Sequence, residues 1–211
     1  MISTPSDSIR LFFALWPGEA ERRLLSGWRL PCSGRAMSPQ TLHATLVFLG
    51  EVDVARLEAL KLAAEEVVAQ RFELCFDVAR YWGHNHIVYA APGIVPVPLQ
   101  YLVSELERHL VQHRFKFDTP HSNLPREVEG AIVPSHLGLK SDFEKDMLTS
   151  GLVNPSREYK PHVTLMRNVH WSDEILPEMQ PVHWRVSEFV LLQSEPGEAH
   201  YPVLASFPLS Q

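Results

Sequence analysis

The sequence is poor in several features that define large classes of protein. It has only two cysteines, Cys32 and Cys75, which lie far apart without the CxxC spacing of a redox or metal site. No run approaches the 18 apolar residues of a membrane-spanning helix. The first residues, MISTPSDS, lack the basic and apolar regions of a secretory signal. We therefore expect a reduced, cytoplasmic protein without a membrane anchor.

The chain also lacks clustered basic residues, and its formal net charge is −6. Proteins that grip long nucleic acids release counterions through many Lys and Arg contacts to phosphates. If this chain acts on nucleic acid, we therefore expect it to hold an end or a short fragment. Its 11 histidines keep a metal site under consideration. The length of 211 residues suits a single domain, residues 1–211, and we expect a monomer.

Hydrophobic periodicity predicts an α/β (α+β) chain. Apolar runs bounded by Pro or Gly indicate strands, and apolar residues at three- and four-residue spacing indicate helices, the second of them capped by Asp53. The predicted strands are residues 10–17, 42–51, 72–82, 86–92, 161–166, 184–194 and 201–209, and the predicted helices are 19–28, 54–69 and 99–113. Residues 119–160 have no clear pattern and resemble an insertion.

Two strand-like segments carry the same polar pair. LHATLVFLGE begins at Leu42 and PHVTLMRN begins at Pro161, so H-x-T-L occurs once in each half of the chain. Alternate residues of a strand share a face, so each histidine points the same way as the threonine two residues later. In the first copy this alternation places Val47 and Leu49 on the His43 face.

If the two strands lie side by side about a pseudo-twofold axis, two imidazoles and two hydroxyls converge. One imidazole can act as a general base toward water and the other, protonated, as a general acid toward a leaving oxygen. The hydroxyls of Thr45 and Thr164 can donate hydrogen bonds to phosphate oxygens. From the residues alone, His43 and His162 are interchangeable in the two roles.

The doubled motif and its surroundings resemble the two-histidine phosphoesterase superfamily, and within it the RNA 2′,3′-cyclic phosphodiesterases, also called 2′-5′ RNA ligases. RLFFAL is similar to the opening strand of that family, LHATLVFLGEV and YKPHVTLMR to its motif strands, and VSEFVLLQSE with YPVLASFPL to its closing strands. The fold implied has two pseudo-symmetric lobes, each a small antiparallel sheet flanked by helices, with the active cleft between them. Residues 119–160 depart from the family pattern.

The resemblance implies hydrolysis of an RNA-terminal 2′,3′-cyclic phosphate to a 2′-phosphate, with no metal and no cofactor. It makes His43 the proton donor, His162 the proton acceptor, and Thr45 and Thr164 the phosphate ligands. The partners implied are RNA ends or short oligonucleotides, with reversible 2′-5′ ligation as a further activity.

The resemblance also implies that Phe48 and Arg167, each five residues after its motif histidine, hold a base. Strand alternation places position +5 on the face away from the histidine, unless the strand has ended or contains a bulge.

Three alternatives remain open. The chain can be a phosphodiesterase for another small nucleotide, such as 2′-5′ oligoadenylate or ADP-ribose cyclic phosphate. It can be an RNA-end-binding module without catalysis, or a metallohydrolase. His109 and His113 have the i, i+4 spacing of metal ligands, but no third ligand accompanies them, so we expect a solvated helix face.

Overall fold

The structure is a computed structural model that describes residues 7–28, 34–118, 159–171, 176–195 and 200–211. The strands in these parts are β1 (Ser8–Leu15), β2 (Arg35–Ala36), β3 (Ala44–Asp53), β4 (Phe72–Phe76), β5 (Val78–Trp82), β6 (Ile87–Ala91), β7 (Val163–Arg167), β8 (Val182–Val186), β9 (Glu188–Gln193) and β10 (Val203–Pro208). The helices are α1 (Glu19–Gly27), α2 (Leu57–Glu65) and α3 (Val97–Gln112), with 3-10 turns η1 (Pro39–Thr41) and η2 (Val54–Arg56). Of the predicted insertion, residues 119–160, only Tyr159 and Lys160 belong to the described residues.

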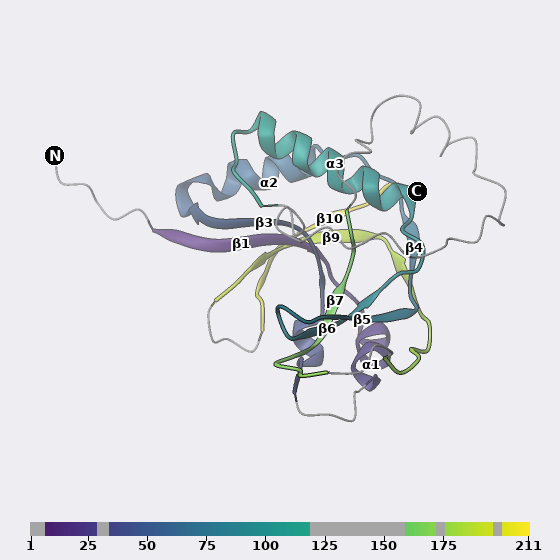
Figure 1. Cartoon of the computed structure of the whole chain (residues 1–211). Helices are drawn as coiled ribbons and strands as arrows, with labels where there is room; N and C mark the ends of the chain where they lie inside the picture. Colours follow the sequence, from purple (N-terminus) through teal and green to yellow (C-terminus); the bar gives the residue numbers. More distant parts are fainter. Residues whose placement is uncertain (1–6, 29–33, 119–158, 172–175, 196–199) are drawn as a thin grey trace.

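Two four-stranded sheets form the framework. The first has the order β10-β9-β1-β3 and the second has the order β2-β7-β6-β5, with every neighbouring pair antiparallel. Helices α2 and α3 pack on each other and contact β10 and β3 of the first sheet (Figure 1). Helix α1 contacts β8 and η1 instead. The predicted arrangement of two lobes with small antiparallel sheets and flanking helices is confirmed.

The predictions of single strands over 72–82 and 184–194 are wrong, because each segment divides between two sheets. The first divides at Asp77, whose carboxylate accepts a 2.6 Å hydrogen bond from the Gly93 amide, and the second divides at Ser187. β4 pairs with β8 in a separate two-stranded sheet, while β5 joins the second sheet and β9 joins the first. The β4–β8 ladder therefore connects the two lobes.

The helices follow the predicted pattern with changes at their ends. The predicted helix 54–69 is shorter, comprising η2 and α2, and Asp53 caps it by accepting a 2.9 Å hydrogen bond from the Ala55 amide. The predicted helix 99–113 begins two residues earlier, at Val97, behind Pro96. None of the helices among the described residues combines the length and apolar character needed to cross a bilayer.

One large apolar core runs through both lobes. It contains buried side chains from both sheets and all three helices, including Phe13, Leu25, Leu60, Leu106 and Leu165. Each sheet also has a smaller apolar cluster apart from this core. The first cluster consists of Phe12, Ala14, Val190 and Leu192, with Trp16, Phe48 and Tyr201 packed against it. The second consists of Ile87, Tyr89 and Ala91, with Trp82 packed against it.

Candidate active site

Each motif histidine lies immediately before its strand and is held in the same way. The Nδ1 atom of His43 lies 2.6 Å from the carbonyl oxygen of Thr41, and the Nδ1 atom of His162 lies 3.2 Å from that of Lys160. A carbonyl oxygen only accepts, so Nδ1 carries the hydrogen in both rings. Nε2 is then the atom left for chemistry in both. The two copies of the motif thus share a hydrogen bond from Nδ1 to the carbonyl two residues earlier, as well as a sequence.

A bulge in β3 changes the predicted faces of the first motif. Thr45 is opposite Ala14 and Phe48 is opposite Phe12, with a register shift between them. Ala14 and Phe12 share one face of β1, so Thr45 and Phe48 share a face as well. The prediction that Val47 and Leu49 continue the His43 face is therefore wrong: both side chains are buried in the large core instead.

The second motif contains a bulge at the equivalent position. Thr164 is opposite Tyr89 and Arg167 is opposite Ile87, again with a register shift between them. Since Tyr89 and Ile87 share a face of β6, Thr164 and Arg167 point the same way. In both motifs two residues lie between the threonine and position +5, whereas only one residue lies between their partners on the neighbouring strand. The bulge is the condition under which position +5 joins the histidine face.

Several contacts hold the two motifs beside one another. The Tyr159 hydroxyl, three residues before His162, donates a 2.6 Å hydrogen bond to the carbonyl oxygen of Thr45. The Met37 amide, on the segment that leads into the first motif, donates to the Leu165 carbonyl at 2.8 Å. β3 and β7 are also in direct contact. Nothing in the sequence pattern singled out Tyr159, and only the tertiary contact reveals its role.

Replacing Tyr159 with phenylalanine should loosen the link between the motifs. Tyr159 is buried, so the variant leaves the Thr45 carbonyl without this donor, and we expect a loss of about 1 kcal/mol in the free energy of unfolding. A small misplacement of reacting groups also lowers the rate, and we expect roughly a tenfold lower kcat. Tyr81→Phe is the control, because Tyr81 donates a similar 2.7 Å bond to the Val169 carbonyl, which follows the second motif and does not connect it to the first. Equal losses of kcat in the two variants would contradict a specific role for Tyr159.

Aromatic rings enclose both histidines. The rings of Phe12 and Tyr201 lie 5.0 and 5.3 Å from the His43 ring, and the Trp16 ring is stacked beside it at 6.2 Å. None of these three was identified from the sequence, since they come from distant segments. Edge-on contacts with Trp82 at 4.8 Å and Tyr89 at 5.6 Å flank His162. These rings cover part of each imidazole and leave both histidines partly buried.

The surroundings of His43 favour a neutral ring. Burial lowers the pKa of His43 from 6.5 to about 4, and the positive charges of Arg167 and Arg22 contribute in the same direction. The bond to the Thr41 carbonyl opposes this by stabilising the charged ring. An anion placed at Nε2 would favour the imidazolium further. Without an anion at Nε2, the neutral His43 ring is suited to accept a proton. With an anion there, His43 is suited to donate a proton as well.

This lowered pKa predicts a pH-dependent contribution to stability. The unfolded chain binds a proton at His43 below pH 6.5, while the folded protein does so only below about pH 4. Stability is therefore lost as pH falls from 6.5 to 4, by up to roughly 3 kcal/mol at this site. We expect His43→Gln to reduce this loss, as measured by urea unfolding at about pH 7.5 and about pH 4.5, on either side of most of this range. The same pH dependence in wild type and variant would show that His43 is not protected from protonation.

Phe48, in the middle of β3, and Arg167, at the end of β7, are each paired with a second backbone segment on the other side of the strand. Phe48 exchanges backbone hydrogen bonds of 3.0 and 2.7 Å with Asp118, and Arg167 is paired in the same position with Arg35. The Arg10 guanidinium lies 4.8 Å from the centre of the Phe48 ring. Arg167 is exposed, and no described carboxylate forms an ion pair with it. Both side chains are therefore available on the histidine faces.

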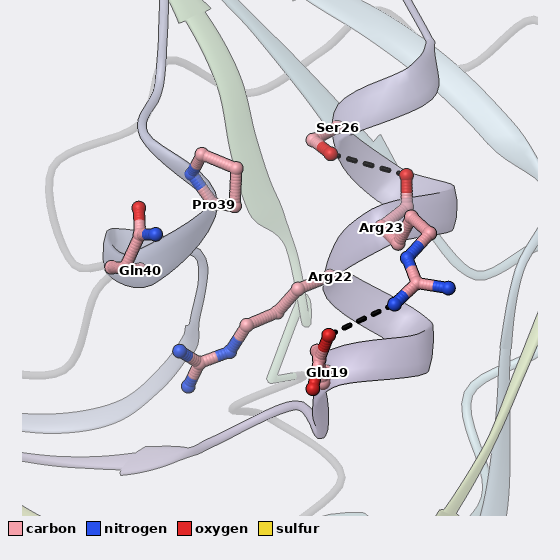
Figure 2. Close-up of a pocket in the computed structure, with 6 residues that line it drawn as sticks. All are labelled: Glu19, Arg22, Arg23, Ser26, Pro39 and Gln40. Atoms are coloured by element: carbon pink, nitrogen blue, oxygen red, sulfur yellow. Dashed lines mark hydrogen bonds and ion pairs between the residues drawn. The ribbon is translucent and has the colours of Figure 1, made fainter.

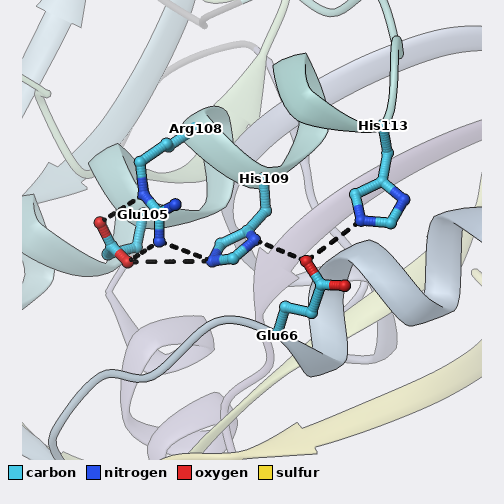
Figure 3. Close-up of polar contacts among 5 residues, drawn as sticks. All are labelled: Glu66, Glu105, Arg108, His109 and His113. Atoms are coloured by element: carbon cyan, nitrogen blue, oxygen red, sulfur yellow. Dashed lines mark hydrogen bonds and ion pairs between the residues drawn. The ribbon is translucent and has the colours of Figure 1, made fainter.

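The other histidine pair binds a carboxylate (Figure 3). Glu66 at the end of α2 accepts hydrogen bonds from His109 at 2.9 Å and from His113 at 3.1 Å, and Arg108 pairs with Glu105 beside them. The bonds to both histidines lower the pKa of Glu66. His109 is buried, so the prediction of a solvated helix face is wrong for it. These bonds tie α2 to α3. No group of three or more His, Cys, Asp or Glu among the described residues is arranged to hold a metal ion.

Comparison with known proteins identifies relatives over nearly the whole chain. An Escherichia coli (strain K12) protein described as an RNA 2′,3′-cyclic phosphodiesterase is 27% identical over 213 residues, covering 98% of this chain and 99% of the relative. The crystal structure of E. coli LigT complexed with 3′-AMP matches with a TM-score of 0.70 at 24% identity, covering 97% of this chain and 100% of that one. The crystal structure of a Thermus thermophilus protein, TT0787, matches with a TM-score of 0.62 at 20% identity, covering 95% and 98%.

Because these two structures are less than 25% identical to this chain, they are evidence for the two-lobed fold alone. The family follows from a separate comparison. The family model described as the 2′-5′ RNA ligase superfamily matches residues 16–198, which include both HxT motifs and all the strands from β3 to β9. The chain therefore belongs to the 2′-5′ RNA ligase superfamily.

Proposed function

We propose that this protein is a metal-independent RNA 2′,3′-cyclic phosphodiesterase in which His43 and His162 transfer the protons. The observation that carries the proposal is the pair of matched histidines. Each is held through Nδ1 by the carbonyl two residues before it, and each precedes a strand with the same bulge. A relative described as an RNA 2′,3′-cyclic phosphodiesterase is similar over nearly the whole length of both chains, which supports the proposal.

The reaction follows from the two Nε2 atoms. His162 Nε2 accepts a proton from water as the water oxygen attacks the phosphorus atom. The bond between phosphorus and O3′ breaks, and O3′ takes the proton of His43 Nε2. The products are a 2′-phosphate and a free 3′-hydroxyl. When a 5′-hydroxyl replaces water as the nucleophile, the same roles give a 2′-5′ linkage and a free 3′-hydroxyl. The reverse reaction, with the two roles exchanged, cleaves that linkage back to the 2′,3′-cyclic phosphate and the 5′-hydroxyl.

His43 enters this scheme as the acid in spite of its low pKa in the unliganded site. A cyclic phosphate carries a negative charge, which raises the pKa of an adjacent imidazole. It also offsets the positive charge of Arg167, which is one of the causes that lower the pKa of His43. Substrate binding therefore brings His43 toward the protonation state that the leaving oxygen requires.

The other residues of the two motifs hold the substrate in this proposal. The hydroxyls of Thr45 and Thr164 donate to the non-bridging phosphate oxygens, where negative charge accumulates in the transition state. Phe48 and Arg167 hold the terminal base between an aromatic ring and a guanidinium plane. Their positions on the same faces as the threonines support this assignment.

The decisive test is turnover of a short RNA that ends in a 2′,3′-cyclic phosphate, with EDTA present. We expect a 2′-phosphate product, identified by its resistance to enzymes that remove only 3′-phosphates, and a rate unchanged by the chelator. A panel of 2′-5′ oligoadenylate and ADP-ribose cyclic phosphate tests the nearest alternative, because the histidines would act in the same way on those phosphodiesters. Loss of activity with EDTA would favour a metallohydrolase. Tight binding of the RNA end without turnover would favour a binding module.

A further inference from the structure

A hollow of 340 Å³ lies between helix α1 and the η1 turn. Figure 2 shows its lining side chains, with the Arg22 side chain extending from α1 toward η1. The residues that line it are Glu19, Arg22, Arg23, Ser26, Pro39 and Gln40. Its volume is at the lower end of the range of small-molecule sites, and five of the six residues that line it have polar side chains. Nothing in the proposed reaction uses this hollow.

The two arginines that line the hollow differ in their interaction partners. Arg23 forms an ion pair with Glu19 at 2.9 Å on the exposed side of α1. Arg22 donates from Nε to the Pro17 carbonyl at 2.7 Å, and its guanidinium lies 4.2 Å from the centre of the Trp16 ring. No described carboxylate forms an ion pair with Arg22. Arg22 thus presents a fixed positive charge that the described carboxylates leave uncompensated.

Trp16 and the η1 turn connect the hollow to the histidine of the first motif. Trp16, which packs against Arg22, is also stacked on His43 with an angle of 30° between the ring planes. The η1 turn ends at Thr41, whose carbonyl holds His43 Nδ1. The charge of Arg22 is close enough to lower the pKa of His43. A substrate whose phosphate lies at His43 therefore has its next group within reach of this hollow.

We propose that Arg22 binds the phosphodiester that joins the terminal nucleotide to the nucleotide before it. This inference rests on the proposed function. The cyclic phosphate binds to the two motif histidines and the two motif threonines. The next negative charge along the RNA strand is then that of the phosphodiester. A guanidinium presents a planar fork of donors that matches phosphate oxygens, and the bond from Nε to Pro17 together with the Trp16 ring orients it. Gln40 lines the opposite side of the hollow, where its amide oxygen accepts a hydrogen bond from the Ser38 hydroxyl and leaves its NH2 group to donate (Figure 2). The site then selects oligonucleotide ends over free nucleoside 2′,3′-cyclic phosphates.

The experiment compares three substrates with the same terminal nucleoside: a nucleoside 2′,3′-cyclic phosphate, a dinucleotide with the same cyclic end, and that dinucleotide with an uncharged methylphosphonate linkage. In the wild type we expect the dinucleotide to have a kcat/KM at least about tenfold above those of the other two, as a charge-assisted contact implies. Arg22→Gln should abolish most of this advantage, and Arg22→Lys should restore part of it. The advantage should also decline with added salt, because the hollow is open to solvent.

Arg23→Gln is the matched control, since Arg23 lines the same hollow but is paired with Glu19. We expect it to change the ratio of kcat/KM between dinucleotide and mononucleotide by less than about twofold, as for an exposed, already paired charge. Any effect of Arg22 through Trp16 and His43 alters both substrates alike and cancels in the ratio.

Two results would overturn the inference while leaving the proposed function intact. One is a wild-type enzyme that treats the charged and methylphosphonate dinucleotides equally. The other is an Arg22→Gln variant that lowers kcat/KM for all three substrates by the same factor. Failure of the proposed function looks different, because none of the three substrates is then turned over. In that event calorimetric binding decides: equal affinity for the charged and uncharged dinucleotides overturns the inference, and tighter binding of the charged one that is lost in Arg22→Gln supports it.

Discussion

Replacing His43 or His162 with alanine should lower kcat for an RNA 2′,3′-cyclic phosphate by about 10²–10⁴-fold in each case, the usual contribution of a positioned acid or base. The reason is that each ring supplies a single Nε2 atom, and the Nδ1 bonds to Thr41 and Lys160 keep it aimed. The double variant should be little worse than the worse single variant, because the two groups act in one step. The measurement is single-turnover kinetics, with circular dichroism to show that the variants remain folded.

A change of leaving group separates the acid from the base. From a p-nitrophenyl phosphodiester the p-nitrophenolate ion departs without protonation, so its release needs no general acid. With that substrate the defect of His43→Ala should shrink toward the wild type, while the defect of His162→Ala should persist. The opposite pattern would reverse the two roles. Retention of full activity in either alanine variant, on the RNA substrate, would remove that histidine from the mechanism.

Replacing Thr45 or Thr164 with valine should lower kcat by about 10²-fold or more, as for other single donors to a developing negative charge. Valine has the shape of threonine without the hydroxyl. Both side chains are half-buried in strands, and valine is β-branched and favours strands as threonine does, so the fold should tolerate the change. KM should change less than kcat, because the hydrogen bonds strengthen as charge accumulates on the phosphate oxygens.

Serine at the same positions is the control for the threonine variants. Thr45→Ser and Thr164→Ser keep the hydroxyl and lose only a methyl group, so they should recover most of the rate that valine loses. Valine variants with wild-type kcat, or serine variants as slow as the valine variants, would show that the hydroxyls do not act on the phosphate. The first result would leave the threonines as structural residues of their strands.

The main elements of the fold were predictable from local pattern. The opening strand, α1, α3 and the closing strand all lie within a few residues of their predicted bounds, and Asp53 is the cap that it was expected to be. These features depend on side chains near one another in sequence, such as apolar spacing, a capping carboxylate or a terminating proline. The alternation in 72–82 and 184–194 also predicted strands, but it did not reveal that each segment crosses from one sheet to another.

In the candidate site, too, some features depend on local sequence and others on the tertiary structure. Sequence alone determined the four residues of the two HxT motifs, since a repeated polar pair in an apolar strand requires no tertiary information. The faces of Phe48 and Arg167 were decided by the bulges in β3 and β7, which exist only relative to the partner strands β1 and β6.

The surroundings of the histidines were decided by tertiary structure as well. Trp16, Tyr201 and Arg22 reach the first histidine, and Tyr159 joins the two motifs, although these residues come from separate parts of the chain. Sequence pattern records the period of a single strand or helix. Which side chains from distant segments meet at a site depends on how the sheets pair and pack, and that is settled only when the whole chain is folded.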